Sequence, residues 1–188
     1  MWGRLLVSGA SVAGVLALSG EAHAEGRTRD GFYLSMDAGI GYLSSNAAGE
    51  PSWRDGLESV SSLSPALGFW AGGTVGRTVI GGGFFANYLV VPGTWGAFLL
   101  TPGMFLDIHP SRQSKLHIVP FLGWGWLAPW LFGPMGPVAS VGVGYDFWEP
   151  SESWSLGMMG RLAYGPLFQH EGTYHTFAPS LLFTATYH

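Results

Sequence analysis

The sequence predicts an all-β fold, an eight-stranded antiparallel up-and-down transmembrane β-barrel. Only 11% of the 188 residues are charged and 47% are hydrophobic, whereas soluble domains carry roughly 25% charged residues. The chain also contains 30 glycines and 12 prolines, which disfavour long uninterrupted helices. Apolar residues alternate with small or polar residues along successive segments, as in strands whose two faces meet different surroundings.

Helical membrane spans are the main alternative. Residues 78–106 and 116–145 contain no Asp, Glu, Lys or Arg, so a hydropathy window would mark both stretches as spans. The first stretch contains three consecutive glycines, at 81–83, and the second contains four prolines. Each proline removes an amide donor and disrupts a regular helix. Because a bilayer admits only helices and closed barrels, rejecting helices leaves a barrel.

Eight segments show apolar residues at alternate positions, which we assign to the outer face. At about 10 residues each, eight strands leave no room for a porin of about 16 strands with its loops. The apolar sets are Phe32, Leu34, Met36, Ala38, Ile40 and Tyr42; Leu63, Leu67, Phe69 and Val75; Ile80, Phe84, Tyr88 and Val90; Phe98, Leu100, Met104, Leu106 and Ile108; Leu116, Ile118, Leu122, Trp124 and Trp126; Ala139, Val141, Val143, Tyr145 and Phe147; Trp154, Leu156, Met158, Leu162 and Tyr164; and Phe177, Leu181, Phe183, Ala185 and Tyr187.

Residues 1–24 are predicted to be a cleaved secretory signal peptide. Arg4 gives the positive start, residues 5–18 form an apolar run, and Ala22-His23-Ala24 matches a small-x-small cleavage site. A membrane anchor is the alternative, but a spanning helix needs about 20 apolar residues. The barrel domain is then 25–188. The absence of cysteine excludes disulfides and a lipidated amino terminus.

The charged residues within the predicted strands fall on the inner face. The predicted polar cluster of the lumen is Asp37, Asp107, His117, Asp146 and Arg161. On the lipid face an arginine would cost about 2–4 kcal/mol, whereas in a lumen Arg161 could pair with Asp146 of the neighbouring strand. A hydrogen-bonded plug is favoured over a proton or solute path. The many inward glycines could nevertheless leave space for water or a thin ligand.

Outward aromatic residues are predicted to form two girdles at the membrane boundaries. If the amino terminus is periplasmic, one girdle lies toward the outside and the other near the periplasmic rim. The members are Tyr42, Tyr88, Trp126 and Tyr164 on the outer side and Phe147, Trp154 and Tyr187 on the inner side. The same orientation predicts periplasmic turns at 76–77, 109–115 and 148–153, and external loops at 45–62, 91–94, 129–136 and 168–174.

The sequence resembles the small outer-membrane β-barrels of Gram-negative bacteria, the group that includes the OmpA transmembrane domain, OmpX and OmpW-like proteins. The resemblance covers residues 25–188 and rests on the signal peptide, the opening strand GFYLSMDAGIGYL, the hairpin rhythm and the final strand FAPSLLFTATYH. It implies an outer-membrane location, contact with outer-membrane lipids and recognition by the barrel-assembly machinery. In that group a terminal aromatic residue is part of the assembly signal; here Tyr187 is followed by His188.

A weak candidate metal site lies in the last predicted external loop, at His170, Glu171 and His175. Two imidazoles and a carboxylate can bind a divalent metal, but loop histidines are common, and we predict no metal and no cofactor. Some barrels of similar architecture modify lipid A with a Ser, His and acidic group. No serine can be assigned beside these histidines, so no catalytic residue is predicted.

The function that best fits these features is a structural or surface-interaction role for a monomeric barrel with a largely plugged lumen. A narrow pore or small-hydrophobe conduit is the first alternative, and a lipid A-modifying enzyme is the second. Nucleic acid is a poor partner, because eight Lys and Arg against twelve Asp and Glu leave no basic excess to bind phosphates.

Overall fold

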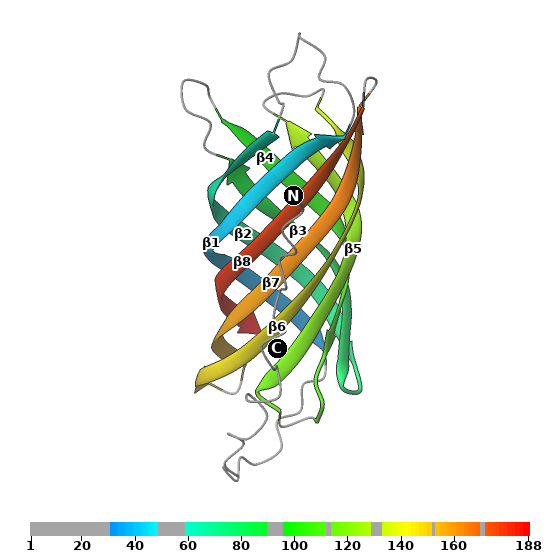
Figure 1. Cartoon of the computed structure of the whole chain (residues 1–188). Coiled ribbons are helices and arrows are strands. Elements are labelled where there is room, and N and C mark those ends of the chain that lie inside the picture. The colour runs from blue at the N-terminus through cyan, green and yellow to red at the C-terminus, as the bar shows by residue number, and fades with distance from the viewer. Residues whose placement is uncertain are drawn as a thin grey trace, which may run out of the picture.

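The computed structural model describes residues 31–48, 59–89, 96–111, 114–128, 133–151, 153–169 and 172–188; the predicted signal peptide lies outside them. These residues form a closed barrel in which each strand pairs antiparallel with its neighbours and β8 returns to β1 (Figure 1). The described residues include no helix long and apolar enough to cross a membrane. The strands are β1 (Phe32–Ala48), β2 (Ser59–Val75), β3 (Thr78–Leu89), β4 (Ala97–Ile108), β5 (Leu116–Ala128), β6 (Met135–Ser151), β7 (Trp154–Gln169) and β8 (Gly172–Tyr187).

The two faces of the barrel wall differ as the alternation predicts. Every described member of the eight apolar sets is partly or fully exposed, with Leu63 at 76% and Met104 at 68%. The residues between them are mostly buried, and Leu43 and Leu99 are exposed by at most 1%. Since the outer face is an apolar band and the hydrogen-bonded ladder is closed, the barrel meets both requirements for crossing a bilayer.

The strands have unequal lengths. β1, β2 and β6 have 17 residues and β7 and β8 have 16, whereas β3 and β4 have 12 and β5 has 13. A tilted strand crosses the hydrocarbon layer with about 9–11 residues. Along β1 the outward side chain changes from Tyr42 to Ser44 and Asn46, so the long strands continue beyond the apolar band.

The observed strand bounds correct four predicted connections. In the predicted loop 129–136, β6 already begins at Met135. The predicted loop 168–174 is mostly strand, because β7 continues to Gln169 and β8 begins at Gly172. Parts of 45–62 belong to β1 and β2, and most of 148–153 belongs to β6, which has register shifts after Asp146 and Trp148. Apolar alternation marks only the segment in lipid, whereas the backbone ladder continues where polar side chains face water. The predicted turn at Gly76 is confirmed, and Gly76 adopts the left-handed φ of 67° that glycine tolerates.

Prolines interrupt the ladder from the outer face. A proline has no amide donor and is rare inside sheets. The prolines in described strands whose side chains are placed have outward positions, and pairing lapses beside most of them. Between β1 and β8 the register breaks next to Pro179, and between β4 and β5 it breaks at Pro102. The rings thus meet lipid while the inward positions on either side stay available for packing. The prolines are Pro65, Pro102, Pro120, Pro137, Pro166 and Pro179.

Candidate functional site

The lumen contains the buried side chains of the barrel and is the candidate functional site. We call the end where β1 finishes and β2 begins the loop end, and the end where β2 turns into β3 the turn end. The half toward the loop end is packed with aliphatic residues, which are all exposed by at most 1%. They are Leu43, Leu89, Leu99, Leu127, Val138 and Leu167.

An aromatic layer crosses the lumen below these residues. The Trp70 ring meets Phe105 and Phe121 edge to face, with centroids 5.3 and 5.5 Å apart, and Phe121 meets Phe85 at 5.3 Å. Tyr33 extends the layer through Phe105, at 5.7 Å. Such tilted contacts suit the quadrupoles of aromatic rings. Each of these five rings comes from a different strand, from β1 to β5.

The inward glycines accommodate these rings. A Cβ at Gly103 or Gly123 would collide with the ring of Phe121, and a Cβ at Gly83 would collide with Trp70. The expectation that such glycines leave space for water or a thin ligand is therefore wrong at these positions. A bulky neighbour fills the space that each missing side chain provides, as close packing of an interior requires.

The predicted ion pair between Arg161 and Asp146 is not formed. In the β6–β7 register Arg161 lies opposite Gly142 and Asp146 lies opposite Gly157, so the two charges are separated by about 13 Å along the strands. The Arg161 guanidinium instead lies over the ring of Phe85, 4.2 Å from its centroid, a cation–π contact. The two residues lie on neighbouring strands, but the hairpin register sets them at different levels.

Two pairs of buried polar residues are bonded across the barrel. Asp37 accepts a hydrogen bond from Nε1 of Trp70, and the Asn87 side-chain amide donates to the Ser180 hydroxyl over 3.3 Å. Asp37 is 3% exposed and Arg161 is 4% exposed. The structure therefore places both charges inside the barrel, next to the aromatic layer.

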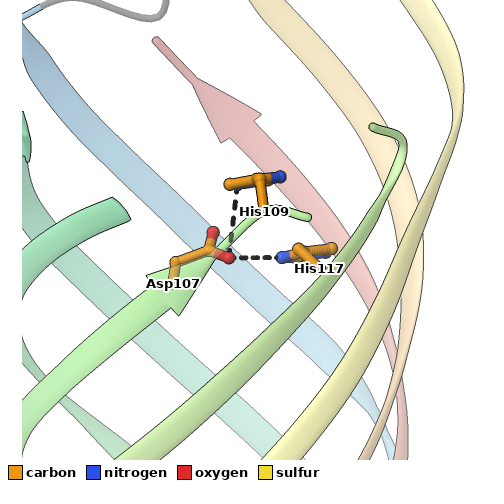
Figure 2. A group of neighbouring side chains, drawn as sticks. All are labelled: Asp107, His109 and His117. Carbon is orange, nitrogen blue, oxygen red and sulfur yellow. Dashed lines mark hydrogen bonds and ion pairs between the residues drawn. The ribbon is translucent and has the colours of Figure 1, made fainter. Parts of the chain in front are cut away.

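A cluster of Asp107, His109 and His117 lies at the turn end (Figure 2). Nδ1 of His117 lies 2.8 Å and Nε2 of His109 lies 3.3 Å from the same carboxylate oxygen, Oδ1 of Asp107. The two imidazole rings are parallel within 2°, with centroids 5.2 Å apart. The Tyr33 hydroxyl donates to Oδ2 of Asp107 over 3.1 Å. All three donor atoms lie within 4.8 Å of one another, so the cluster has the ligand types and spacing to hold a metal ion.

Sequence reasoning placed His109 in a turn and missed its role. His109 follows β4 directly and shares the inward parity of Asp107. The Asp-x-His spacing at a strand end was the available signal, because residues two apart on a strand face the same side.

The outward aromatic residues lie at two levels of the wall. Tyr42, Tyr88 and Tyr164 are 41–50% exposed toward the loop end, and Trp126 is half-buried against Phe98. Toward the turn end stand Phe147, Trp154 and Tyr187, with the Trp154 and Tyr187 rings 5.4 Å apart. Aromatic rings at two such levels are typical of membrane boundaries.

The predicted loop cluster is only partly described. His170 and Glu171 lie outside the described residues. His175 lies on β8 with an exposed side chain, where it stacks on Tyr164 and its Nδ1 is 2.8 Å from the tyrosine hydroxyl. Among the described residues His175 is thus engaged with an aromatic partner rather than with a second metal ligand.

The closed eight-stranded wall, the apolar exterior and the two aromatic levels define a small transmembrane β-barrel. Neisserial surface protein A has a similar structure, with a TM-score of 0.59 and 14% identity over 83% of this chain and 96% of that chain. Ail, the attachment invasion locus protein of Yersinia pestis, is similar with a TM-score of 0.49 and 11% identity over 82% and 99% of the two chains. The outer-membrane protein OprG from Pseudomonas aeruginosa gives a TM-score of 0.40 and 14% identity over 85% of this chain and 97% of that chain.

The sequence matches no protein-family model and no curated protein. The structural similarity confirms the predicted fold class and the resemblance to the small outer-membrane β-barrels of Gram-negative bacteria. That class is located in the bacterial outer membrane.

Proposed function

We propose that the protein is a monomeric outer-membrane barrel with a closed lumen, and that it has a structural or surface-interaction role without catalysis. The observation that carries the proposal is the aromatic layer of Trp70, Phe85, Phe105 and Phe121, fitted against inward glycines. Its partners would be outer-membrane lipids and, during biogenesis, the barrel-assembly machinery, with no nucleic acid.

The layer supports a closed lumen because its rings pack against one another across the lumen. An ion crosses a pore only where water or polar groups replace its hydration shell. Here the rings meet at 5.3–5.5 Å, and the aliphatic residues Leu99 and Leu127 follow toward the loop end, each 1% exposed. Barrels of about eight strands are generally filled by their own side chains in this way.

The extended strands support a role at the surface. Ser44 and Asn46 on β1 face outward beyond Tyr42, and Asn46 pairs with both Ser59 of β2 and His175 of β8. This part of the wall is a hydrogen-bonded ladder with polar side chains, which gives a rigid surface for recognition outside the lipid. The Tyr164 contact of His175 gives no support to an acyl-transfer site, which needs a histidine beside a nucleophilic serine.

Planar-bilayer conductance tests the closed lumen. The refolded protein, checked by its strand-type circular dichroism spectrum and heat-dependent gel mobility, should give no ohmic steps. Phe121→Ser should give measurable steps, because it replaces the central ring with a group that water can solvate. Phe183→Ala is the matched control, since Phe183 is 61% exposed on the outer face, and it should stay silent.

Regular conductance steps from the folded wild-type protein would contradict the closed lumen and favour the narrow pore. The absence of catalysis is tested separately by mass spectrometry of lipid A incubated with and without the protein. A gained or lost acyl chain would overturn that part of the proposal.

A further inference from the structure

We propose that Asp107, His109 and His117 form a binding site for one divalent transition-metal ion of the zinc class at the turn end of the lumen. This site is distinct from the loop group His170, Glu171 and His175, and it goes beyond the closed-lumen function. Four features of the described residues carry the proposal: the convergence of the donor atoms, their support, the local charge and the ligand chemistry.

The donor atoms converge on one point. Both imidazoles direct a nitrogen at the same oxygen of Asp107, at 2.8 and 3.3 Å, and the three donors lie within 4.8 Å. With metal bonds of about 2.0–2.2 Å, the donors of a tetrahedral site stand about 3.3–3.6 Å apart. The three atoms therefore reach the required spacing through adjustments of about 1 Å or less at each side chain.

Neighbouring residues hold the donors in this arrangement. Tyr33 occupies Oδ2 of Asp107 and so leaves Oδ1 directed at the imidazoles, as a supporting hydrogen bond does in metal sites. A Cβ at Gly144 would collide with the ring of His117, so glycine at this position is what allows the ring to lie there. Asp107, His109 and His117 are each at most 5% exposed.

The charge inside the barrel favours a cation. The buried charged side chains of the described residues are Asp37, Asp107, Asp146 and Arg161. These are three carboxyl groups and one guanidinium. Buried charges are stable only when they are offset, and a divalent ion bound by Asp107 would offset negative charge at this end of the lumen.

Two imidazole nitrogens and one carboxylate oxygen define the class of metal. Imidazole suits zinc, copper and nickel, whereas magnesium and calcium prefer oxygen ligands. Three protein ligands leave a fourth position for water. His109 directly follows β4, at the end of the barrel, and Phe105 lies four residues farther inside. An ion can therefore arrive from the turn end without crossing the aromatic layer.

The test is calorimetric titration of Zn²⁺ into the mature chain, refolded in detergent and carrying no histidine tag. We expect one saturable site per chain that EDTA reverses. Cu²⁺ should occupy the same site and show nitrogen coupling in its electron paramagnetic resonance spectrum. His109→Gln should weaken Zn²⁺ binding more than 100-fold, and Tyr33→Phe, which alters only the support of Asp107, should weaken it about 10–100-fold.

His175→Gln is the matched control and should bind Zn²⁺ like the wild type, because His175 lies on the outer face. Heat-dependent gel mobility establishes that each variant is folded. His109→Gln is used because His109 lies at the end of the barrel and glutamine keeps a polar side chain there. No saturable binding by the folded wild type would overturn the proposal. Wild-type affinity in His109→Gln, or a loss in His175→Gln, would overturn it as well, the latter in favour of the loop histidines.

Discussion

The two halves of the lumen are built differently although one wall encloses both. Toward the loop end, Leu43, Leu99 and Leu127 pack as in the core of a soluble protein. Toward the turn end, Tyr33 and the imidazoles of the cluster are organised around the Asp107 carboxylate. Stability in the first half depends on filled volume, and in the second half it depends on polar contacts such as those of Asp107. The aromatic layer separates the two.

The comparison shows that the lumen of a small barrel need not be uniformly polar. The alternation of the strands requires only that the outer face be apolar, because that face meets lipid. The inner face is free to use either kind of packing. The buried charges are consequently gathered in and below the aromatic layer, where partners on other strands can reach them.

Disrupting the aromatic layer between the two halves should have the largest effect on the free energy of unfolding. Trp70→Ala should lower the free energy of unfolding by about 4–5 kcal/mol, because it leaves a cavity beside Phe105 and Phe121 and removes the donor to Asp37. Urea unfolding in detergent measures the change. Trp124→Ala removes the same side chain from the outer face, where Trp124 is 54% exposed; an equal loss there would mean that Trp70 does not hold the layer.

A change in the aliphatic half should act through volume alone. Leu127→Ala should cost about 3 kcal/mol. Leu127 pairs with Leu99 across β4 and β5. The loss of unfolding free energy in the double variant Leu99→Ala, Leu127→Ala should therefore differ from the sum of the two single losses by about 0.5 kcal/mol or more. Leu127→Ala combined with Tyr33→Phe, at the other end, should be additive within about 0.5 kcal/mol. Strong coupling between the ends would show that the halves are not independent.

A change in the polar half should act through one hydrogen bond. Tyr33→Phe keeps the ring against Phe105 and His188 and removes the donor to the Asp107 carboxylate, at a cost of about 1.5–2 kcal/mol. Urea unfolding in metal-free buffer measures it. Tyr145→Phe, on the outer face, should be neutral, and a neutral result for Tyr33→Phe would mean that the polar half does not depend on this bond.

The smallest effect is expected outside the lumen. Tyr164→Phe removes the exposed contact with Nδ1 of His175 and should change the unfolding free energy by less than about 0.5 kcal/mol. The same urea experiment checks it. A loss as large as that of Tyr33→Phe would mean that this outer contact contributes as much as the buried bond.

The strand count, the facing of residues and the closed barrel could be predicted because each depends on local alternation. The positions of side chains across the lumen could not, since they depend on the register of every hairpin. Arg161 and Asp146 have the same parity on neighbouring strands, yet the β6–β7 register separates them. The fit of Phe121 against Gly103 and Gly123 likewise joins residues whose relation no spacing in the sequence reveals.

Because the strands have unequal lengths, the barrel wall is higher on one side than on the other. β1 and β2 have 17 residues and β3 and β4 have 12. At about 3.3 Å per residue and a tilt of about 45°, the five extra residues raise one side of the wall by about 12 Å. A neighbouring membrane protein therefore meets a higher polar wall at β1 and β2 than at β3 and β4. The surface that the barrel presents outside the lipid thus depends on the direction of approach in the plane of the membrane.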